Sequence, residues 1–317
     1  MQIESVKGLT ISVLLGLSFS SMAIDSTISK VIYGNDNRQD LKDSPLTDFQ
    51  RLALSTAVQI KQSYFTLLPN GNLQLEATET LKKQINACDD EPFATQLAVG
   101  NCSGFLVSSD LLVTAGHCMD SESDCENFVW AFDYAEGKMK DSQLSKENVY
   151  NCKKILKQTV DQVTMNDYAV IQLDRPVTNR APLNFRLEVS VKLGDSLVVI
   201  GHPSGLPTKI ADGATVQQVE HPAYFQADLD TYGGNSGSAV FNAKTGEVEG
   251  ILVRGAKDYV FDRERGCYLS NRCEKMDTEN RICEGESVSR ISAVDIVALE
   301  MQDLVDKEPS LATNLTD

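Results

Sequence analysis

Short apolar or alternating runs, separated by turn residues, follow one another along the chain from Ser103 onward. They span Gly104 to Val107, Leu111 to Thr114, Phe128 to Phe132, Tyr168 to Leu173, Leu197 to Ile200, Ala239 to Phe241 and Val248 to Val253. Runs of this length and composition are typical of β-strands. Their rhythm predicts a mostly antiparallel, all-β protein.

Helical periodicity is clearest in two places, Ala77 to Ile85 and Ser292 to Val305, and we expect a helix in each. The stretch from Arg175 to Phe185 contains two prolines and has no clear period. It is the expected connection between two β units of comparable size.

The charge balance excludes some partners. With 45 acidic and 29 basic residues the chain carries a formal net charge of -16. An acidic surface repels nucleic acid and anionic lipid, so we expect neither as a partner. Solubility alone could explain this acidity.

The first residues predict export. Lys7, an apolar stretch from Leu9 to Phe19 and the small-residue site at Ser21 to Ala23 together resemble a secretory signal peptide over residues 1–23. No later segment approaches the ~20 apolar residues that a membrane span needs. The mature protein is therefore expected to be secreted, either extracellular or periplasmic, with no membrane span.

Eight cysteines in an exported chain favour disulfides over free thiols. They are Cys88, Cys102, Cys118, Cys125, Cys152, Cys267, Cys273 and Cys283. Closely paired Cys or His ligands of the kind that hold zinc are absent, since the cysteines are widely spaced and the chain has three histidines. We expect no metal site, and we expect Cys125 to pair with Cys152 because both lie beside neighbouring strand-like runs.

The segments Cys102 to Val107 and Leu112 to Cys118 place a histidine, His117, beside a cysteine after two predicted strands. A bridge between Cys102 and Cys118 would fix the loop that carries this histidine. A lone histidine is most often structural, so its interpretation depends on the rest of the chain.

Two further motifs follow. Asp167 stands at the start of a strongly apolar strand, where an aspartate is often only a turn former. Gly233 to Val240 contains Ser236 between glycines and leads into another strand. Glycines on both sides allow a sharp turn that aims backbone N–H groups inward, as an oxyanion site requires.

The order His, Asp, Ser matches chymotrypsin-like peptidases and differs from subtilisin and the α/β-hydrolases. The segment Gly234-Asn-Ser-Gly-Ser238 also lacks the final glycine of the nucleophile elbow. An α/β-hydrolase is therefore disfavoured.

Thr114-Ala-Gly-His-Cys118 and Gly234-Asn-Ser-Gly-Ser238 resemble the signatures of trypsin-like serine peptidases. Asn235, where trypsin has aspartate, is similar to the bacterial glutamyl endopeptidase branch. The resemblance runs from about Lys30 to Glu300 and implies two packed six-stranded antiparallel β-barrels of the chymotrypsin-like type. We expect the first over residues 31–180 and the second over 181–317, with a cysteine-containing loop at 258–286 and the C-terminal helix.

The resemblance also implies the roles of the site residues. Ser236 would be the nucleophile of an acyl-enzyme mechanism, His117 the general base and then acid, and Asp167 the group that orients the imidazole. Backbone N–H groups of Gly234 and Ser236 would form the oxyanion hole. No cofactor is implied, the partners would be protein or peptide substrates, and we expect a monomer.

Substrate preference is predicted from Asp230, which, counting back from Ser236, falls where trypsin-like enzymes keep the residue at the base of the primary pocket. That position favours cleavage after Lys or Arg. The strand Ile251 to Arg254 lacks the histidine that glutamyl endopeptidases use there, which argues against Glu preference. Arg254 could instead pair with Asp230 and close the pocket, or itself attract acidic residues.

Activation by an ion pair at the residue before the nucleophile is excluded, because Asn235 carries no charge. Ser29 to Arg38 resembles the mature start of the glutamyl endopeptidase branch, so residues 24–30 could be a short propeptide cleaved after Lys30. Alternatively, this segment remains attached as a frayed end.

Other interpretations remain open at this level. The loop from Asp258 to Glu286 could restrict substrate access or only stabilise the fold. His202 and His221 each precede a proline in loop-like contexts, and we expect both to be structural. A secreted peptidase homologue that binds without catalysis is the alternative function, although no member of the His, Asp, Ser set is missing.

Overall fold

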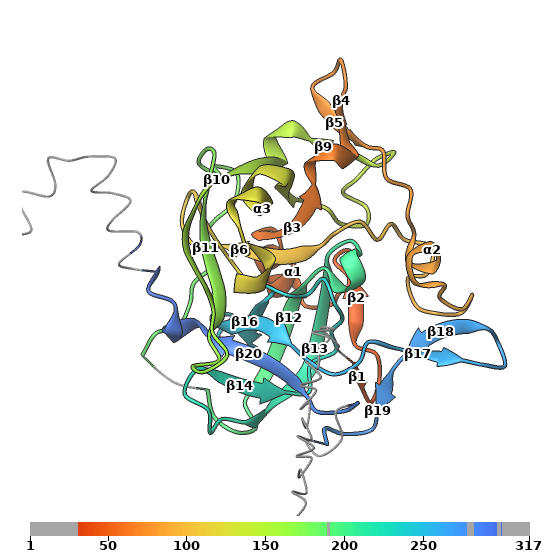
Figure 1. Cartoon of the computed structure of the whole chain (residues 1–317), viewed down its shortest axis with the longest axis vertical. Coiled ribbons are helices and arrows are strands. Elements are labelled where there is room, and N and C mark those ends of the chain that lie inside the picture. The colour runs from red at the N-terminus through yellow and green to blue at the C-terminus, as the bar shows by residue number, and fades with distance from the viewer. Residues whose placement is uncertain (1–30, 189–190, 278–281, 297–298, 300–317) are drawn as a thin grey trace, which may run out of the picture.

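Two closed antiparallel barrels of six strands each form most of the protein (Figure 1). The computed structural model describes residues 31–188, 191–277, 282–296 and 299. The first barrel consists, in spatial order, of β10 (Val149–Val160), β11 (Asp167–Leu173), β7 (Leu111–Thr114), β6 (Cys102–Leu106), β3 (Thr56–Lys61) and β8 (Phe128–Phe132). It closes where β8 pairs with β10, with Ala131 opposite Val149.

The second barrel has its own strands and one addition. In spatial order these are β12 (Ser196–Gly201), β15 (Ala239–Asn242), β16 (Val248–Arg254), β20 (Glu286–Arg290), β14 (Tyr224–Ala227) and β13 (Lys209–Gln218). The barrel closes where β12 pairs with β13. β2 (Arg38–Asp40) adds to β13, so a segment from near the N-terminus packs on the second barrel.

The all-β, two-barrel prediction is therefore confirmed. The seven apolar runs predicted from the sequence lie in β6, β7, β8, β11, β12, β15 and β16, except that Val107 follows the end of β6. The strand β10 was not predicted from the sequence, because lysines at 153, 154 and 157 interrupt its apolar residues. Pairing with β11 and β8, which pattern alone does not reveal, makes this segment a strand.

Apolar side chains fill three places that matter for the site. Trp130, Phe132 and Ile171 lie inside the first barrel, and Val199 and Leu252 inside the second. A further cluster joins the barrels and includes Phe105, Val113, Val198, Ile200, Phe241 and Val253. Each such side chain contributes roughly 1.5–3 kcal/mol when fully buried, so the contact between barrels is held firmly.

The connection between the barrels contacts both of them. The Leu183 amide donates to Leu106 O of β6 at 2.8 Å, and the Val248 amide of β16 donates to Asn184 O at 2.9 Å. The chain thus crosses from one barrel to the other as an extended, hydrogen-bonded segment.

Smaller elements decorate this frame. They are β1 (Ile32–Tyr33) paired with β19 (Arg272–Cys273), the hairpin β17 (Tyr259–Asp262) and β18 (Cys267–Ser270), the sheet β4 (Phe65–Leu67), β5 (Asn72–Leu75) and β9 (Gln143–Ser145), and the helices α1 (Thr47–Ala53), α2 (Leu81–Ile85) and α3 (Glu122–Asn127). Short 3₁₀ turns occur at η1 (Gln62–Tyr64), η2 (Gly116–Cys118), η3 (Lys146–Asn148), η4 (Pro203–Gly205) and η5 (Ile291–Ala293).

The first predicted helix is shorter than expected. The sequence pattern suggested Ala77 to Ile85, but α2 begins only at Leu81. Thr80 is extended, with φ -86° and ψ 161°, and its side chain accepts from the Lys83 amide, so it caps the helix and ends it on the N-terminal side.

Other predictions fall on residues that are not described. Most of the C-terminal helix expected from Ser292 to Val305 lies outside the described residues, as do the expected signal peptide at 1–23 and propeptide at 24–30. Among the described residues, no helix combines the length and apolar character needed to cross a membrane.

All eight cysteines form disulfides. The pairs are Cys88–Cys267, Cys102–Cys118, Cys125–Cys152 and Cys273–Cys283. The two pairs expected from the sequence are among them. The other two join the 258–286 loop to residues far away and to itself, which neighbouring sequence could not indicate.

Candidate active site

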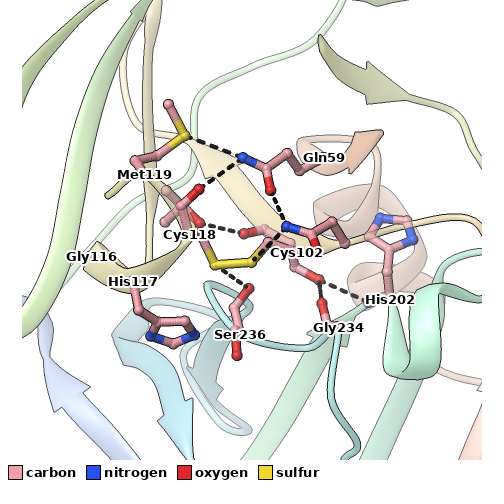
Figure 2. Close-up of a disulfide and its surroundings, with 12 residues drawn as sticks. Gln59, Cys102, Gly116, His117, Cys118, Met119, His202, Gly234 and Ser236 are labelled. Atoms are coloured by element: carbon pink, nitrogen blue, oxygen red, sulfur yellow. Dashed lines mark hydrogen bonds between the residues drawn. A yellow bond between two sulfur atoms is a disulfide. The ribbon is translucent and has the colours of Figure 1, made fainter. Parts of the chain in front are cut away.

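His117 lies in the turn η2, directly after β7 (Figure 2). Its neighbour Cys118 forms a disulfide with Cys102 of β6, which ties the turn to that strand. A Cβ atom at Gly116 would lie 2.1 Å from Thr159 O of β10, and only glycine therefore allows the turn to approach that strand. These constraints hold the imidazole, which is 19% exposed, at the junction of the barrels.

Asp167, the first residue of β11, holds the imidazole from behind. Its Oδ2 lies 2.9 Å from His117 Nδ1, and its Oδ1 accepts the His117 amide at 3.2 Å. The strands bring them together because β11 pairs with β7, with Ala169 opposite Thr114. Burial by itself would raise the pKa of Asp167, but the hydrogen bonds and charge of His117, and the charge of Arg254, lower it below its usual value.

Ser236 lies beside the His117 ring in Figure 2. Its hydroxyl is buried, and within the described residues neither Ser236 Oγ nor His117 Nε2 has a hydrogen-bond partner. His117 is therefore hydrogen-bonded to Asp167, whereas Ser236 lies beside the His117 ring without a hydrogen bond to it.

The loop around Ser236 depends on two glycines with left-handed backbone. Gly234 has φ +88° and Gly237 has φ +87°. Added Cβ atoms would lie 2.6 Å from His202 O and 2.0 Å from Ser103 O, respectively. Within the described chain, the amides of Gly234 and Ser236 donate to no carbonyl or side chain. This leaves both N–H groups available to an oxyanion.

The hydrogen-bond partners of Asp230 lie in the N-terminal segment. Asp230 is buried, and its two oxygens accept the amides of Tyr33 at 2.8 Å and Asn37 at 2.9 Å. Burial raises the pKa of Asp230 to about 7, although the amides of Asn37 and Tyr33 lower it in part. The carboxyl group thus anchors the N-terminal segment immediately behind the Ser236 loop.

Arg254 forms no ion pair with Asp230. Its guanidinium donates to Met165 O at 3.0 Å and lies 5.8 Å from the centroid of the Tyr224 ring. The pocket-closing pair considered from the sequence is therefore not formed, and the positive charge of Arg254 lies on the Asp167 side of the site.

Sequence reasoning missed two buried residues at this site. Glu286 is fully buried and accepts a hydrogen bond from Thr231 Oγ1 at 2.6 Å. Glu286 belongs to β20, which follows Ser236 by about 50 residues in the sequence. It comes close to the site because β20 pairs with β16. Ser103 is fully buried and contacts the Ser236 loop directly. Its position next to Cys102 was the one available signal.

The two remaining histidines have structural roles, as expected. His202 is buried, its Nδ1 lies 3.0 Å from Leu206 O, and burial lowers its pKa to about 3, so it stays neutral. His221 stacks on Tyr224 with ring centroids 4.2 Å apart.

A metal at this site does not fit the residues present. One ligand atom each from Cys102, His117 and Cys118 lie within 4.8 Å of one another. Both sulfur atoms are consumed by the disulfide between them, so no thiolate is available to bind an ion.

Comparison with known proteins supports the peptidase resemblance. A family model described as "Trypsin-like peptidase domain" matches residues 102–251. The structure titled "Atomic resolution structure of HBP" is similar with a TM-score of 0.50 and 12% identity, covering 87% of this chain and 97% of that one. At this identity the similarity concerns the fold.

The structures of two endopeptidases are also similar. A Glu endopeptidase in complex with MPD has a TM-score of 0.48 and 16% identity, covering 86% of this chain and 99% of that one. A serine endoprotease from Yersinia pestis has a TM-score of 0.47 and 16% identity, covering 84% and 68%. Residues 102–251 are therefore similar in sequence to a trypsin-like peptidase domain, and the chain around them has the two-barrel, chymotrypsin-like fold.

Proposed function

We propose that this protein is a secreted serine endopeptidase that hydrolyses peptide bonds through an acyl-enzyme intermediate. The observation that carries the proposal is the Asp167 carboxylate bound to His117 Nδ1, with the opposite nitrogen, Nε2, unbonded and beside Ser236. Bonding at Nδ1 leaves Nε2 as the proton acceptor in the neutral imidazole.

In the first step, Ser236 Oγ attacks the carbonyl carbon while His117 Nε2 takes the hydroxyl proton. The electron pair of the carbonyl moves to its oxygen, which the amides of Gly234 and Ser236 would bind. Collapse of this intermediate expels the amine, which takes the proton from His117. Water then repeats the sequence on the acyl group, so the products are an amine and a carboxylic acid.

Asp167 supports both steps by remaining ionised. Its lowered pKa keeps the carboxylate charged at neutral pH, where it stabilises the imidazolium that forms. The amides of Gly234 and Ser236 stabilise the oxyanion, and a donor of this kind typically increases the rate by ~10²–10³-fold.

For the residue before the cleaved bond we propose Lys or Arg. Three acidic side chains gather behind the Ser236 loop, since Asp230 lies just before it, Glu286 binds Thr231, and Asp258 accepts the Gly233 amide at 3.0 Å. Arg254 is directed to Met165 instead. The negative charge of these groups favours a cationic side chain through the electric field, and the contribution of Asp230 grows above pH 7 because its pKa is raised to about 7.

Four disulfides support export to an oxidising compartment, extracellular or periplasmic, as part of the same proposal. The expected partners are protein or peptide substrates of a monomeric enzyme.

The test is to produce residues 24–317 in an oxidising compartment and assay peptides with Arg, Lys, Glu or Phe before the scissile bond. Ser236→Ala and His117→Ala should abolish cleavage and labelling by a fluorophosphonate, while His221→Ala serves as the matched control and should keep both. Cleavage after Glu would retain the triad and reject the basic preference. A folded protein without cleavage or labelling would favour the non-catalytic homologue.

A further inference from the structure

The peptide units around Ser236 are each held through their carbonyl oxygens. Gly233 O accepts the Ser204 amide at 2.5 Å, and Asn235 O accepts the Ser238 amide at 2.8 Å. The carbonyls of Gly234 and Ser236 both accept hydrogen bonds from a single residue of the other barrel. That residue is Ser103 of β6.

The hydroxyl, the amide and the carbonyl of Ser103 all form hydrogen bonds. Its hydroxyl donates to Gly234 O at 2.8 Å, and its amide donates to Ser236 O at 2.8 Å. The hydroxyl also accepts the His202 amide at 3.0 Å, and the Ser103 carbonyl accepts Thr114 Oγ1 at 2.7 Å. Figure 2 shows Gly234, Ser236 and His202, the residues that these hydrogen bonds reach, near the disulfide between Cys102 and Cys118.

The amides on the far side of the same peptide units are also satisfied. Asn235 N donates to Tyr232 O at 3.0 Å, and Gly237 N donates to Leu252 O at 2.8 Å. The peptide unit between Gly234 and Asn235 is therefore fixed at both ends. It lies between the two units that carry the amides of Gly234 and Ser236, so its orientation sets the angle between those amides.

Because residue 234 is a glycine, the peptide unit that follows it needs hydrogen bonds to hold its orientation. With φ +88° and no side chain, Gly234 has a backbone that rotates more readily than that of other residues. Without the Ser103 hydroxyl, the Gly234 carbonyl would lose its donor and the His202 amide its acceptor. A buried group without a partner costs ~1–3 kcal/mol, enough to favour a rotated peptide.

We propose that Ser103 is a positioning residue for the oxyanion site. Its hydroxyl holds the Gly234 carbonyl against the first barrel, so that the amides of Gly234 and Ser236 converge on the substrate carbonyl oxygen. This role rests on the proposed peptidase function. It also links the barrels, because the residue that shapes the loop of the second barrel belongs to the first and adjoins the Cys102–Cys118 disulfide beside His117.

The test compares Ser103→Ala with the wild type on the best peptide of the substrate panel. We expect kcat to fall ~10–100-fold with KM changed less than about twofold, because oxyanion contacts act mainly in the transition state. The inhibition constant of a peptide aldehyde with the same sequence should rise in proportion to the loss of kcat/KM, since its adduct carries the same oxyanion.

Two further variants and a control separate positioning from stability. Ser103→Gly removes the same hydroxyl and serves if the alanine variant does not fold, whereas Ser103→Thr keeps the hydroxyl and should retain most of kcat. Ser55→Ala is the matched control, because it removes another side-chain hydrogen bond to a carbonyl, from Ser55 Oγ to Ala181 O at 2.6 Å. It should lower stability and leave kcat unchanged.

The outcomes distinguish this proposal from the function beneath it. Wild-type hydrolysis with an unchanged kcat in Ser103→Ala and Ser103→Gly would overturn the role of Ser103 alone. A folded wild type without hydrolysis dependent on Ser236 would overturn the proposed function, and the role of Ser103 with it.

Discussion

The Asp230 carboxylate accepts the backbone amide of Tyr33 at 2.8 Å, joining positions 197 residues apart in the sequence. Its other oxygen accepts the Asn37 amide. Because Gly233 and Gly234 follow soon after Asp230, this contact ties the N-terminal segment to the loop that carries Ser236. The contact uses internal amides, so it needs no free α-amino group. This agrees with the uncharged Asn235 before the nucleophile.

The raised pKa of Asp230 predicts a pH-dependent stability. In the folded protein burial raises the pKa to about 7 from 3.8, so between these values the folded state binds a proton that the unfolded state has lost. This contribution therefore favours folding below about pH 4 and is lost as pH rises toward 7, by on the order of 2–4 kcal/mol.

Guanidinium unfolding of wild type and Asp230→Asn at several pH values measures this effect. The difference in the free energy of unfolding, wild type minus variant, should decrease from pH 4 to 7 and then level off. A constant difference would show that Asp230 has an ordinary pKa.

Replacing Asp167 should damage catalysis more than structure. Asp167→Asn keeps the shape but offers an amide to His117, which favours the wrong tautomer. We expect kcat to fall by about 10³–10⁴ while labelling of Ser236 by a fluorophosphonate slows in parallel. Steady-state kinetics with a circular dichroism check measures it, and activity within tenfold of wild type would remove Asp167 from the triad.

Gly116 should tolerate no side chain. In Gly116→Ala the new Cβ would lie 2.1 Å from Thr159 O, so the turn that carries His117 has to move. A displacement of this kind can cost ~10²-fold in rate. Gly71→Ala is the comparison, because Gly71 has φ +85° but nothing within 4 Å of an added Cβ, and it should affect only stability. Equal kcat values for the two variants would contradict the prediction.

The long disulfide should stabilise more than the short one. Cys88–Cys267 closes a loop of 179 residues and Cys273–Cys283 a loop of 10. Loop-closure entropy gives about 5 and about 3 kcal/mol respectively. Paired Cys→Ser variants, compared by chemical unfolding, should show this order. Neither pair adjoins His117 or Ser236, so kcat should be retained, and a reversed order would point to strain or residual structure in the unfolded chain.

The burial of Arg38 predicts that lysine cannot replace it. Its guanidinium binds both oxygens of Asp36 and lies between the rings of Phe93 and Tyr232, at 5.3 and 4.3 Å from their centroids. A lysine ammonium has neither the planar fork nor the stacking surface. We expect Arg38→Lys to lower the free energy of unfolding by ~2–4 kcal/mol, as thermal or chemical unfolding would show. A loss below ~0.5 kcal/mol would contradict this.

The sequence by itself predicted the strands whose apolar residues are contiguous and the three motifs around His117, Asp167 and Ser236. These are local properties, since alternation, turn residues and flanking glycines are visible within a few positions. The sequence also predicted the Cys102–Cys118 pair, because both cysteines adjoin the same two strands.

Only the tertiary structure decided which distant residues meet. β10 became a strand through its neighbours, and Glu286 reached Thr231 through strand pairing in the second barrel. Only the structure shows that the oxygens of Asp230 accept amides of the N-terminal segment, because a carboxylate's partners depend on chain packing. Ser103 contacts the loop that carries Ser236 for the same reason, because the barrels pack with β6 against that loop. Hydrogen bonds of this kind depend on angles and distances in space, which no local pattern encodes.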